Sequence, residues 1–268
     1  MTMRSARKST GAKLGQHFLT GLWAAHRLAE AVDVKSGETI LEIGPGKGAL
    51  TKELLATGAR VVAVEKDPLL VRQLYDRFTK SIVEKQLTII KADVRDFNPS
   101  KSNLTTEKYV LAANIPYYIT GEIIRQFLET AVQPRAMALL VQKEVADRII
   151  ARNGKESILS LSVKAYGTPK IIARVSRGNF SPPPNVDSAI LLIGDISKKF
   201  FQGFDEKIFF KVVRAGFASK RKFLANNLAV AFGKDAASHA LRMCDLDTDV
   251  RAEDVPLEKW KCLARQLS

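Results

Sequence analysis

The tetrapeptide Asn114-Ile115-Pro116-Tyr117, which follows the apolar run 109–113, holds side chains that could do chemistry on a nucleobase. The Asn114 side-chain carbonyl and the Pro116 backbone carbonyl can each accept one hydrogen of an amino group, and Tyr117 can stack on a flat ring. Proline fixes its own φ and restrains the residue before it, so the second carbonyl has a set direction. Two acceptors on an adenine amino group favour a tetrahedral nitrogen whose lone pair can attack an electrophilic methyl group. Taken alone, the tetrapeptide is better explained as a polar strand end followed by an ordinary X-Pro turn, so the surrounding sequence has to decide.

Strands and helices alternate through the first half of the chain, and these elements must position the tetrapeptide. Short apolar runs predict strands at 39–43, 60–65, 87–91, 109–113 and 136–141, with a last strand at 185–193. Between them lie amphipathic helices, one of which opens with Asp67-Pro68 in the favoured order of cap and then proline. This alternation predicts an α/β fold with a parallel, Rossmann-like sheet, on which ligands bind beyond the carboxyl ends of the strands. Gly44, Glu65, Asp93 and Asn114 all fall at such ends.

The glycine loop 44–49 satisfies the pattern G-x-G-x-x-A, and Glu65 lies where a ribose-binding acid is expected. A nicotinamide or flavin enzyme is therefore one interpretation. Against it, Pro45 has no N–H to donate to a pyrophosphate. The loop suits a ligand without phosphates, such as S-adenosylmethionine. Glu65 would then accept the ribose hydroxyls, and Asp93 would accept the adenine amino group.

Composition points to a polyanionic partner. The chain has 268 residues, a formal net charge of +14 and a sequence pI near 9.8, and such an excess of cations attracts nucleic acid. No apolar run is long enough to cross a membrane. Cys244 and Cys262 are too few for a disulfide framework, so we expect small buried side chains in a reducing cytoplasm. No cysteine or histidine spacing resembles a zinc site, and no metal is predicted.

The composition changes after Asp195, and we predict two domains. The first spans residues 1–197 and begins with a flexible basic arm. The second spans 198–268, with a linker at 198–203 followed only by helices, four of them, ending near Leu267.

A basic surface is predicted on the second domain, where residues 207–228 contain six cations and no acid. Lys207, Lys211 and Arg214 are spaced to share one face of a helix. Ser219 resembles an N-cap, which would place three further cations in the first turn of the next helix: Lys220, Arg221 and Lys222. Cations there oppose the helix dipole by roughly 0.3–1 kcal/mol each, so we expect an anion, the phosphate backbone of folded RNA.

Five segments together resemble the rRNA adenine N6,N6-dimethyltransferases. They are residues 14–19 (LGQHFL), 42–51 (EIGPGKGALT), 114–117 (NIPY), 179–188 (NFSPPPNVDS) and 213–222 (VRAGFASKRK). The resemblance runs from about Lys13 to the C-terminal helices, and only the glycine loop is shared widely with other families. The last two segments resemble the small-subunit (16S) branch rather than the macrolide-resistance (23S) branch.

The resemblance implies roles for individual residues. The S-adenosylmethionine site would comprise His17, Leu19, Gly44, Gly46, Glu65, Asp93 and Asn114. Asn114, Pro116 and Tyr117 would act on the target adenine. Phe180, beside a stiff proline-rich segment, would supply the second ring around the flipped base, where stacking contributes on the order of 1–3 kcal/mol. The family commonly has Asn where this chain has His17.

These observations predict an S-adenosylmethionine-dependent enzyme that dimethylates N6 of adjacent adenines near the 3′ end of 16S rRNA in the immature small ribosomal subunit. We expect it to be monomeric and cytoplasmic. An adenine methylase acting on 23S rRNA or DNA is an alternative, although the basic C-terminal helices and the Phe180 segment argue against DNA. A non-catalytic assembly or nucleic-acid-binding factor on the same fold is another, against which the intact cofactor residues argue.

Overall fold

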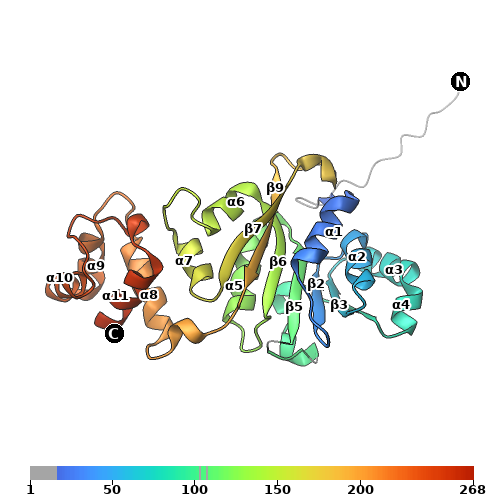
Figure 1. Cartoon of the computed structure of the whole chain (residues 1–268), viewed down its shortest axis with the longest axis horizontal. Coiled ribbons are helices and arrows are strands. Elements are labelled where there is room, and N and C mark those ends of the chain that lie inside the picture. Colours follow the sequence, from blue (N-terminus) through green and yellow to red (C-terminus); the bar gives the residue numbers. More distant parts are fainter. Residues whose placement is uncertain (1–16, 103, 107) are drawn as a thin grey trace, which may run out of the picture.

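A seven-stranded sheet forms the centre of the computed structural model, which describes residues 17–102, 104–106 and 108–268 (Figure 1). Its strands are β2 (Thr39–Ile43), β3 (Arg60–Glu65), β4 (Leu87–Lys91), β5 (Tyr109–Asn114), β6 (Ala136–Gln142), β7 (Thr168–Val175) and β9 (Ser188–Gly194). They lie in the order β4-β3-β2-β5-β6-β9-β7. The first five pair in parallel, as predicted, whereas β9 pairs antiparallel to both β6 and β7.

Helices cover both faces of this sheet, which explains why the inner parallel strands β2, β3, β5 and β6 are almost entirely buried, whereas the edge strand β4 exposes Thr88 and Lys91. On one face lie α1 (Leu22–Ala31), α2 (Ala49–Ala56), α3 (Pro68–Arg77) and α4 (Thr79–Val83), and on the other α5 (Thr120–Glu129), α6 (Lys143–Ile149) and α7 (Ile158–Lys164). Successive strand residues point to opposite faces. Leu111 of β5 therefore packs with Phe127 of α5, while its neighbour Val110 belongs to the cluster that contains Leu28 of α1.

The C-terminal part of the chain is helical, with the four α-helices that were predicted. They are α8 (Glu206–Gly216), α9 (Leu224–Phe232), α10 (Lys234–Met243) and α11 (Leu257–Gln266), with short 3-10 turns η5 (Lys199–Phe201) and η6 (Ala252–Asp254). Trp260 is fully buried among them and donates its indole N–H to the Val255 carbonyl at 3.0 Å. Gly216 packs so closely that a Cβ there would lie 2.4 Å from the Trp260 ring, so this crossing of α8 and α11 needs glycine.

The segment 198–203, predicted to be a linker, is packed instead of extended. Phe201 is buried, and the Phe200 and Phe201 rings lie 5.2 and 5.7 Å from the ring of Phe209 in α8. These contacts belong to the same hydrophobic cluster as the α5 face of the sheet. The helical part is therefore joined to the sheet part through an aromatic core.

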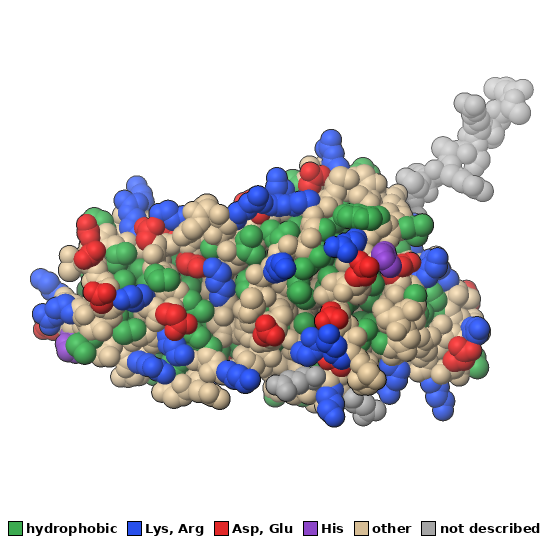
Figure 2. Space-filling model, in the orientation of Figure 1, with side chains coloured by type: hydrophobic (Ala, Val, Ile, Leu, Met, Phe, Trp, Pro, Cys, Tyr) green, Lys and Arg blue, Asp and Glu red, His purple; other side chains and the backbone are tan. Residues whose placement is uncertain are grey.

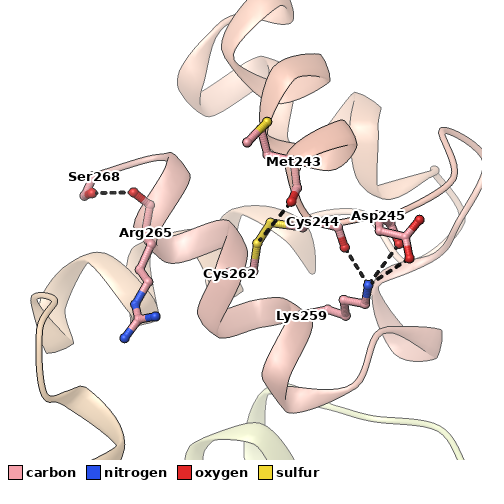
Figure 3. Close-up of a disulfide and its surroundings, with 7 residues drawn as sticks. All are labelled: Met243, Cys244, Asp245, Lys259, Cys262, Arg265 and Ser268. Atoms are coloured by element: carbon pink, nitrogen blue, oxygen red, sulfur yellow. Dashed lines mark hydrogen bonds and ion pairs between the residues drawn. A yellow bond between two sulfur atoms is a disulfide. The ribbon is translucent and has the colours of Figure 1, made fainter.

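The two cysteines are paired, which corrects the expectation of free buried thiols. Cys244, at the end of α10, forms a disulfide with Cys262 of α11, and their Cα atoms lie 5.7 Å apart (Figure 3). Lys259, one turn earlier in α11, donates to the Cys244 carbonyl at 2.7 Å and so fixes the same junction. Counting cysteines had missed the pair because only the packing of α10 against α11 brings the two positions together.

A two-stranded antiparallel sheet ties the start of the described chain to the proline-rich segment. β1 (Phe18–Leu19) pairs with β8 (Phe180–Ser181), in the register Phe18–Ser181 and Leu19–Phe180. Thr20 and Gly21 both donate their backbone N–H to the Asn179 carbonyl, at 2.8 and 3.1 Å. The basic arm and residues 14–16 of the first motif lie outside the described residues. Within the described part of the chain, none of the helices has the length and apolar character needed to cross a membrane.

Candidate active site

Asn114 ends β5 with its side-chain amide held in one orientation. Its Nδ2 donates to the His17 backbone carbonyl at 3.0 Å, and among the described residues no donor is bonded to its Oδ1 oxygen. The 3-10 turn η3 (Tyr117–Ile119) follows, and its Ile119 N–H donates to the Pro116 carbonyl at 3.1 Å. A carbonyl has two lone pairs, so the Pro116 oxygen keeps capacity for a second donor. The tetrapeptide thus carries two carbonyl oxygens with acceptor capacity, and their role in binding an amino group stays a prediction.

The glycine loop between β2 and α2 comes close to this tetrapeptide. Gly44 and Gly46 have φ values of +65° and +57°, which favour glycine. A Cβ on Gly46 would lie 3.1 Å from the Phe18 ring, and one on Gly44 would lie 3.8 Å from the Asn114 carbonyl oxygen. The loop therefore forms a cradle that side chains would fill.

Glu65, at the end of β3, is almost completely buried and braces this loop. Its carboxylate accepts the backbone N–H of Gly46 at 3.2 Å and those of Lys66 and Asp67 at 2.9 Å. Three N–H donors leave one of the roughly four acceptor positions of a carboxylate. That position is available to a ribose hydroxyl.

Asp93 lies beyond β4, and the structure adds a partner that the sequence did not indicate. The Arg95 guanidinium donates to both oxygens of Asp93, at 3.0 and 2.7 Å. This bidentate bond lowers the pKa of Asp93 to about 2. Asp93 is therefore a charged acceptor that Arg95 already shares.

One pocket collects most of the predicted site residues. Its lining includes His17, Gly44, Gly46, Glu65, Asp93, Asn114, Pro116 and Tyr117. The pocket also has an apolar lining, to which Ile43 and Ile115 of the quoted motifs contribute. Sequence reasoning missed Val64, Leu70 and Val94, which carry no signal beyond apolar character within their elements. A flat ring with polar edges fits such a pocket, because apolar walls enclose it and a few placed acceptors orient it.

Leu19 and Phe180 lie outside this lining. Leu19 borders a small adjoining hollow, which shares Gly44, Gly46 and Asn114 with the main pocket. Phe180 is 4% exposed and packs in the hydrophobic cluster of the α1 face, opposite Leu19 in the β1–β8 pair. The structure therefore does not place the Phe180 ring against Tyr117.

Tyr117 is half-buried and faces a different ring. Its hydroxyl is hydrogen-bonded to Ser188 Oγ at 2.7 Å, and burial raises the pKa of its phenol. The His17 imidazole lies over it, with ring centroids 5.7 Å apart and an angle of 30° between the planes. The following residue, Tyr118, also lines the pocket, and its side chain is 67% exposed.

Glu42, inside β2 beneath the glycine loop, is a buried acid that sequence reasoning did not single out. No described group lies in hydrogen-bonding geometry to either of its oxygens, and the Thr51 hydroxyl is also unpaired among the described residues. Burial first, and the nearby charge of Glu65 to a lesser extent, raise the pKa of Glu42 to about 8, although proximity to Thr51 opposes this rise. The folded protein therefore holds a proton here at neutral pH.

Replacing Glu42 by Gln should remove a pH dependence of stability. The pKa of Glu42 is raised from 4.5 to about 8 on folding, so the native state keeps a proton that the unfolded chain releases. As the pH rises from 4.5 to about 8, the free energy of unfolding of the wild type should therefore fall by about 1.4 kcal/mol per pH unit relative to Glu42→Gln. Urea unfolding of both proteins at several pH values measures this difference. If the free energy of unfolding changed with pH in the same way in both proteins, the raised pKa of Glu42 would be contradicted.

The six predicted RNA-binding cations are all exposed in the helical part. Lys207, Lys211 and Arg214 lie on α8 as expected. The predicted N-cap at Ser219 is wrong, because α9 begins at Leu224 and the remaining cations lie in the turn before it. Asn227 stabilises the turn that precedes α9, because its Nδ2 donates to the carbonyls of Gly216 and Ser219, at 2.6 and 3.0 Å.

A cleft between the sheet part and the helical part contains two of these cations. Four cations line it, Arg125, Arg148, Arg214 and Lys220, together with three acids, Glu129, Glu156 and Glu253. Phe210 of α8 and Phe217, the C-cap of that helix, contribute aromatic surface. Figure 2 shows Lys and Arg side chains interspersed with Asp and Glu over the face in view. The cleft is thus a place where cations and aromatic rings meet.

A family model, Ribosomal RNA adenine dimethylase, matches residues 7–267. The chain belongs to this family. It is therefore an rRNA adenine dimethyltransferase that uses S-adenosylmethionine as methyl donor. Ribosomal RNA small subunit methyltransferase A of Dehalococcoides mccartyi is 40% identical over 93% of this chain and 86% of its own length. The protein of the same name from Koribacter versatilis is 35% identical over 98% and 96%.

Solved structures agree with this fold. The 23S rRNA methyltransferase ErmE superposes with a TM-score of 0.76 at 24% identity, covering 93% of this chain and 99% of that one. A dimethyladenosine transferase from Plasmodium falciparum gives 0.76 at 23% identity, covering 92% and 96%. At these identities the two structures support the architecture alone, a Rossmann-like sheet followed by a helical part.

Proposed function

We propose that this dimethyltransferase acts on N6 of adjacent adenines near the 3′ end of 16S rRNA, in the immature small ribosomal subunit. The relatives named small subunit methyltransferase A match nearly the whole chain, including its helical part. The observation that carries the chemistry is the Asn114 side chain. Its amide is fixed by the His17 carbonyl, so that Oδ1 accepts a hydrogen at the pocket.

The chain's own residues bind and orient both reactants. Gly44 and Gly46 permit close approach, Glu65 holds the ribose, and Asp93 accepts the adenine amino group of S-adenosylmethionine, which supplies a sulfonium methyl group when bound. Asn114 and Pro116 accept the two hydrogens of the target N6, and Tyr117 stacks on the target base. Orientation of this kind can contribute a large share of a rate enhancement without a protein nucleophile. Leu19 is assigned to the methionine end of the cofactor because it borders the adjoining hollow.

We keep Phe180 as a candidate for the second stacking ring, with a condition set by its burial. Its ring would have to leave the cluster on the α1 face to reach a base. The β1–β8 pair holds its backbone, so only side-chain rotation or movement of the proline-rich segment would expose it.

The cleft between the two parts of the chain is the proposed path of rRNA. Arg214 and Lys220 line it directly, and the remaining proposed phosphate contacts are Lys207, Lys211, Arg221 and Lys222. The proposed domain boundary is at residues 197 and 198. We also propose that the protein is a monomer and that it acts in the cytoplasm, where its substrate is made. The expectation of free cysteines in a reducing compartment no longer supports this location, because Cys244 and Cys262 are paired.

Removing the cleft cations should weaken RNA binding without altering the cofactor site. For Arg214→Ala combined with Lys220→Ala, we expect Kd for the immature subunit to rise by about 10-fold or more, and the slope of log Kd against log salt to fall by about 2. Affinity for S-adenosylmethionine should not change. Filter binding at several salt concentrations measures the effect, with Lys234→Ala on α10 as an exposed control. An equal loss in the control would argue against a specific path.

Methyl transfer from labelled S-adenosylmethionine tests the substrate. Immature small subunits, naked 16S rRNA, 23S rRNA and DNA would be compared, and product nucleosides identified. Dimethyladenosine in the subunits alone supports the proposal. Methylation of 23S rRNA or DNA instead would replace the proposed substrate, and subunit binding without methylation of any sample would indicate an assembly factor.

A further inference from the structure

His17 connects three parts of the site through three different atoms or groups. Its backbone carbonyl orients the Asn114 amide, and its ring lies over Tyr117. Its Nδ1 is 2.9 Å from the Pro182 carbonyl oxygen in the proline-rich segment. The side chain also lines the pocket and remains partly exposed.

The contact with Pro182 determines which ring nitrogen carries the proton. A backbone carbonyl only accepts hydrogen bonds, so Nδ1 must donate. In a neutral imidazole with a proton on Nδ1, Nε2 has a free lone pair. His17 thus brings a base to a pocket that also contains the acceptors for the target amino group.

Methylation at N6 produces a cation that must lose a proton, and the other groups in the pocket are poorly suited to accept it. Burial keeps the Tyr117 phenol protonated. Asp93 is a weak base, because its pKa is about 2 and Arg95 occupies both oxygens. Glu65 accepts three backbone N–H groups, and the proposed function gives its remaining acceptor position to the cofactor ribose.

We propose that Nε2 of His17 accepts the proton that N6 loses in each round of methyl transfer. The N6 lone pair forms a bond to the methyl carbon while the carbon–sulfur bond breaks, and the electron pair of that bond stays on sulfur. The N6 proton then moves to Nε2, and the partly exposed imidazolium releases it to water. This inference rests on the proposed methylation of adenine in this pocket.

Several ionisable groups surround His17 and could influence its protonation. Those lining the same pocket are Glu65, Lys66, Asp93, Arg95, Tyr117 and Tyr118, and Lys47 lies over the neighbouring Phe18 ring. Glu42, beneath the glycine loop, titrates at about pH 8. A variant that removes the Glu42 titration, Glu42→Gln, therefore belongs in any pH experiment on His17.

The tautomer can be tested without catalysis. The chain has only three histidines, so nitrogen NMR of ¹⁵N-labelled protein resolves each ring, with assignments from His26→Asn and His239→Gln. We expect neutral His17 to carry its proton on Nδ1. A proton on Nε2 would overturn the proposal, because that atom would then have no lone pair to offer.

The pH profile of a single turnover tests the proton transfer. For wild type acting on immature small subunits, we expect the rate to rise with pH and then level off, because only a neutral imidazole can accept the proton. His17→Asn can still donate to Pro182, so it should fold and bind cofactor, but its profile should lose this inflection. Its rate should fall by about 10-fold at the upper end. This is below the 10²- to 10⁴-fold that a positioned base commonly contributes, because water can also accept this proton.

Controls separate this inference from the proposed function. Glu42→Gln and the exposed His239→Gln should keep the wild-type inflection. A His17→Asn profile that keeps it would overturn the role of His17 while leaving the proposed function intact. If wild type forms no methyladenosine on any nucleic acid, the proposed function and this inference both fall.

Discussion

Asn114→Ala is expected to lower kcat/KM for methyl transfer by about 10³-fold, the upper range for loss of one positioned polar group in an active site. Alanine removes the Oδ1 acceptor for the target amino group and leaves the His17 carbonyl without its donor. The N6 lone pair would then stay delocalised in the ring. The segment that contains His17 would also lose one of the hydrogen bonds that hold it at the pocket. Initial rates with labelled methyl donor on immature small subunits measure this change.

A second substitution separates the two contributions of Asn114. Asn114→Asp retains an oxygen acceptor for the target amino group, so we expect a smaller loss of kcat/KM than with alanine. Some loss should remain, because a carboxylate cannot donate to the His17 carbonyl. Calorimetric titration with S-adenosylmethionine shows how much of either loss comes from cofactor affinity. Activity of Asn114→Ala within tenfold of wild type would refute the acceptor role.

Glu65→Ala is expected to weaken S-adenosylmethionine binding by about 10²- to 10³-fold. Hydrogen bonds to a charged group contribute about 1.5–3 kcal/mol each, and this carboxylate accepts three from backbone N–H groups around the glycine loop. Alanine would leave those donors unpaired and also remove the ribose acceptor. Calorimetric titration gives the dissociation constant directly.

Glu65→Gln is the matched control for this change. An amide has one acceptor oxygen in place of two, so it can satisfy only part of the same set of donors. We expect affinity between that of wild type and alanine. Equal affinity in all three proteins would show that the carboxylate neither braces the loop nor meets the cofactor.

The parallel strands could be predicted because the inner ones are buried on both faces and are therefore mostly apolar. β7 was missed for the opposite reason. It is an edge strand with Pro169 near its start and a bulge between Ile171 and Ala173, so it shows neither an apolar run nor a clean alternation. α7 was also missed, since it is only 7 residues long and contains Ser160 and Ser162. Its one local sequence signal is the capping box formed by Ser157 and Ser160.

The pocket was predictable because chemistry-bearing residues at strand ends meet at one edge of a parallel sheet. Its partners were not, because they depend on side-chain geometry across the fold. Arg95 reaches back to Asp93, and the His17 ring meets both Tyr117 and Pro182. The disulfide likewise depends on how α10 packs against α11, which the spacing of Cys244 and Cys262 does not reveal.

The pairing of β1 with β8 has a consequence for biosynthesis. Phe18 and Leu19 are among the first described residues made, whereas their partners Phe180 and Ser181 follow about two thirds of the way along the chain. Closing so long a loop is slow, and it has to wait until the second strand has left the ribosome. A nascent chain can assemble the parallel strands earlier. The side of the pocket formed by His17 is held in place only when β8, beside the proline-rich segment, has been made and pairs with β1. The protein therefore becomes competent for its cofactor late in its own synthesis, shortly before the helical part is completed.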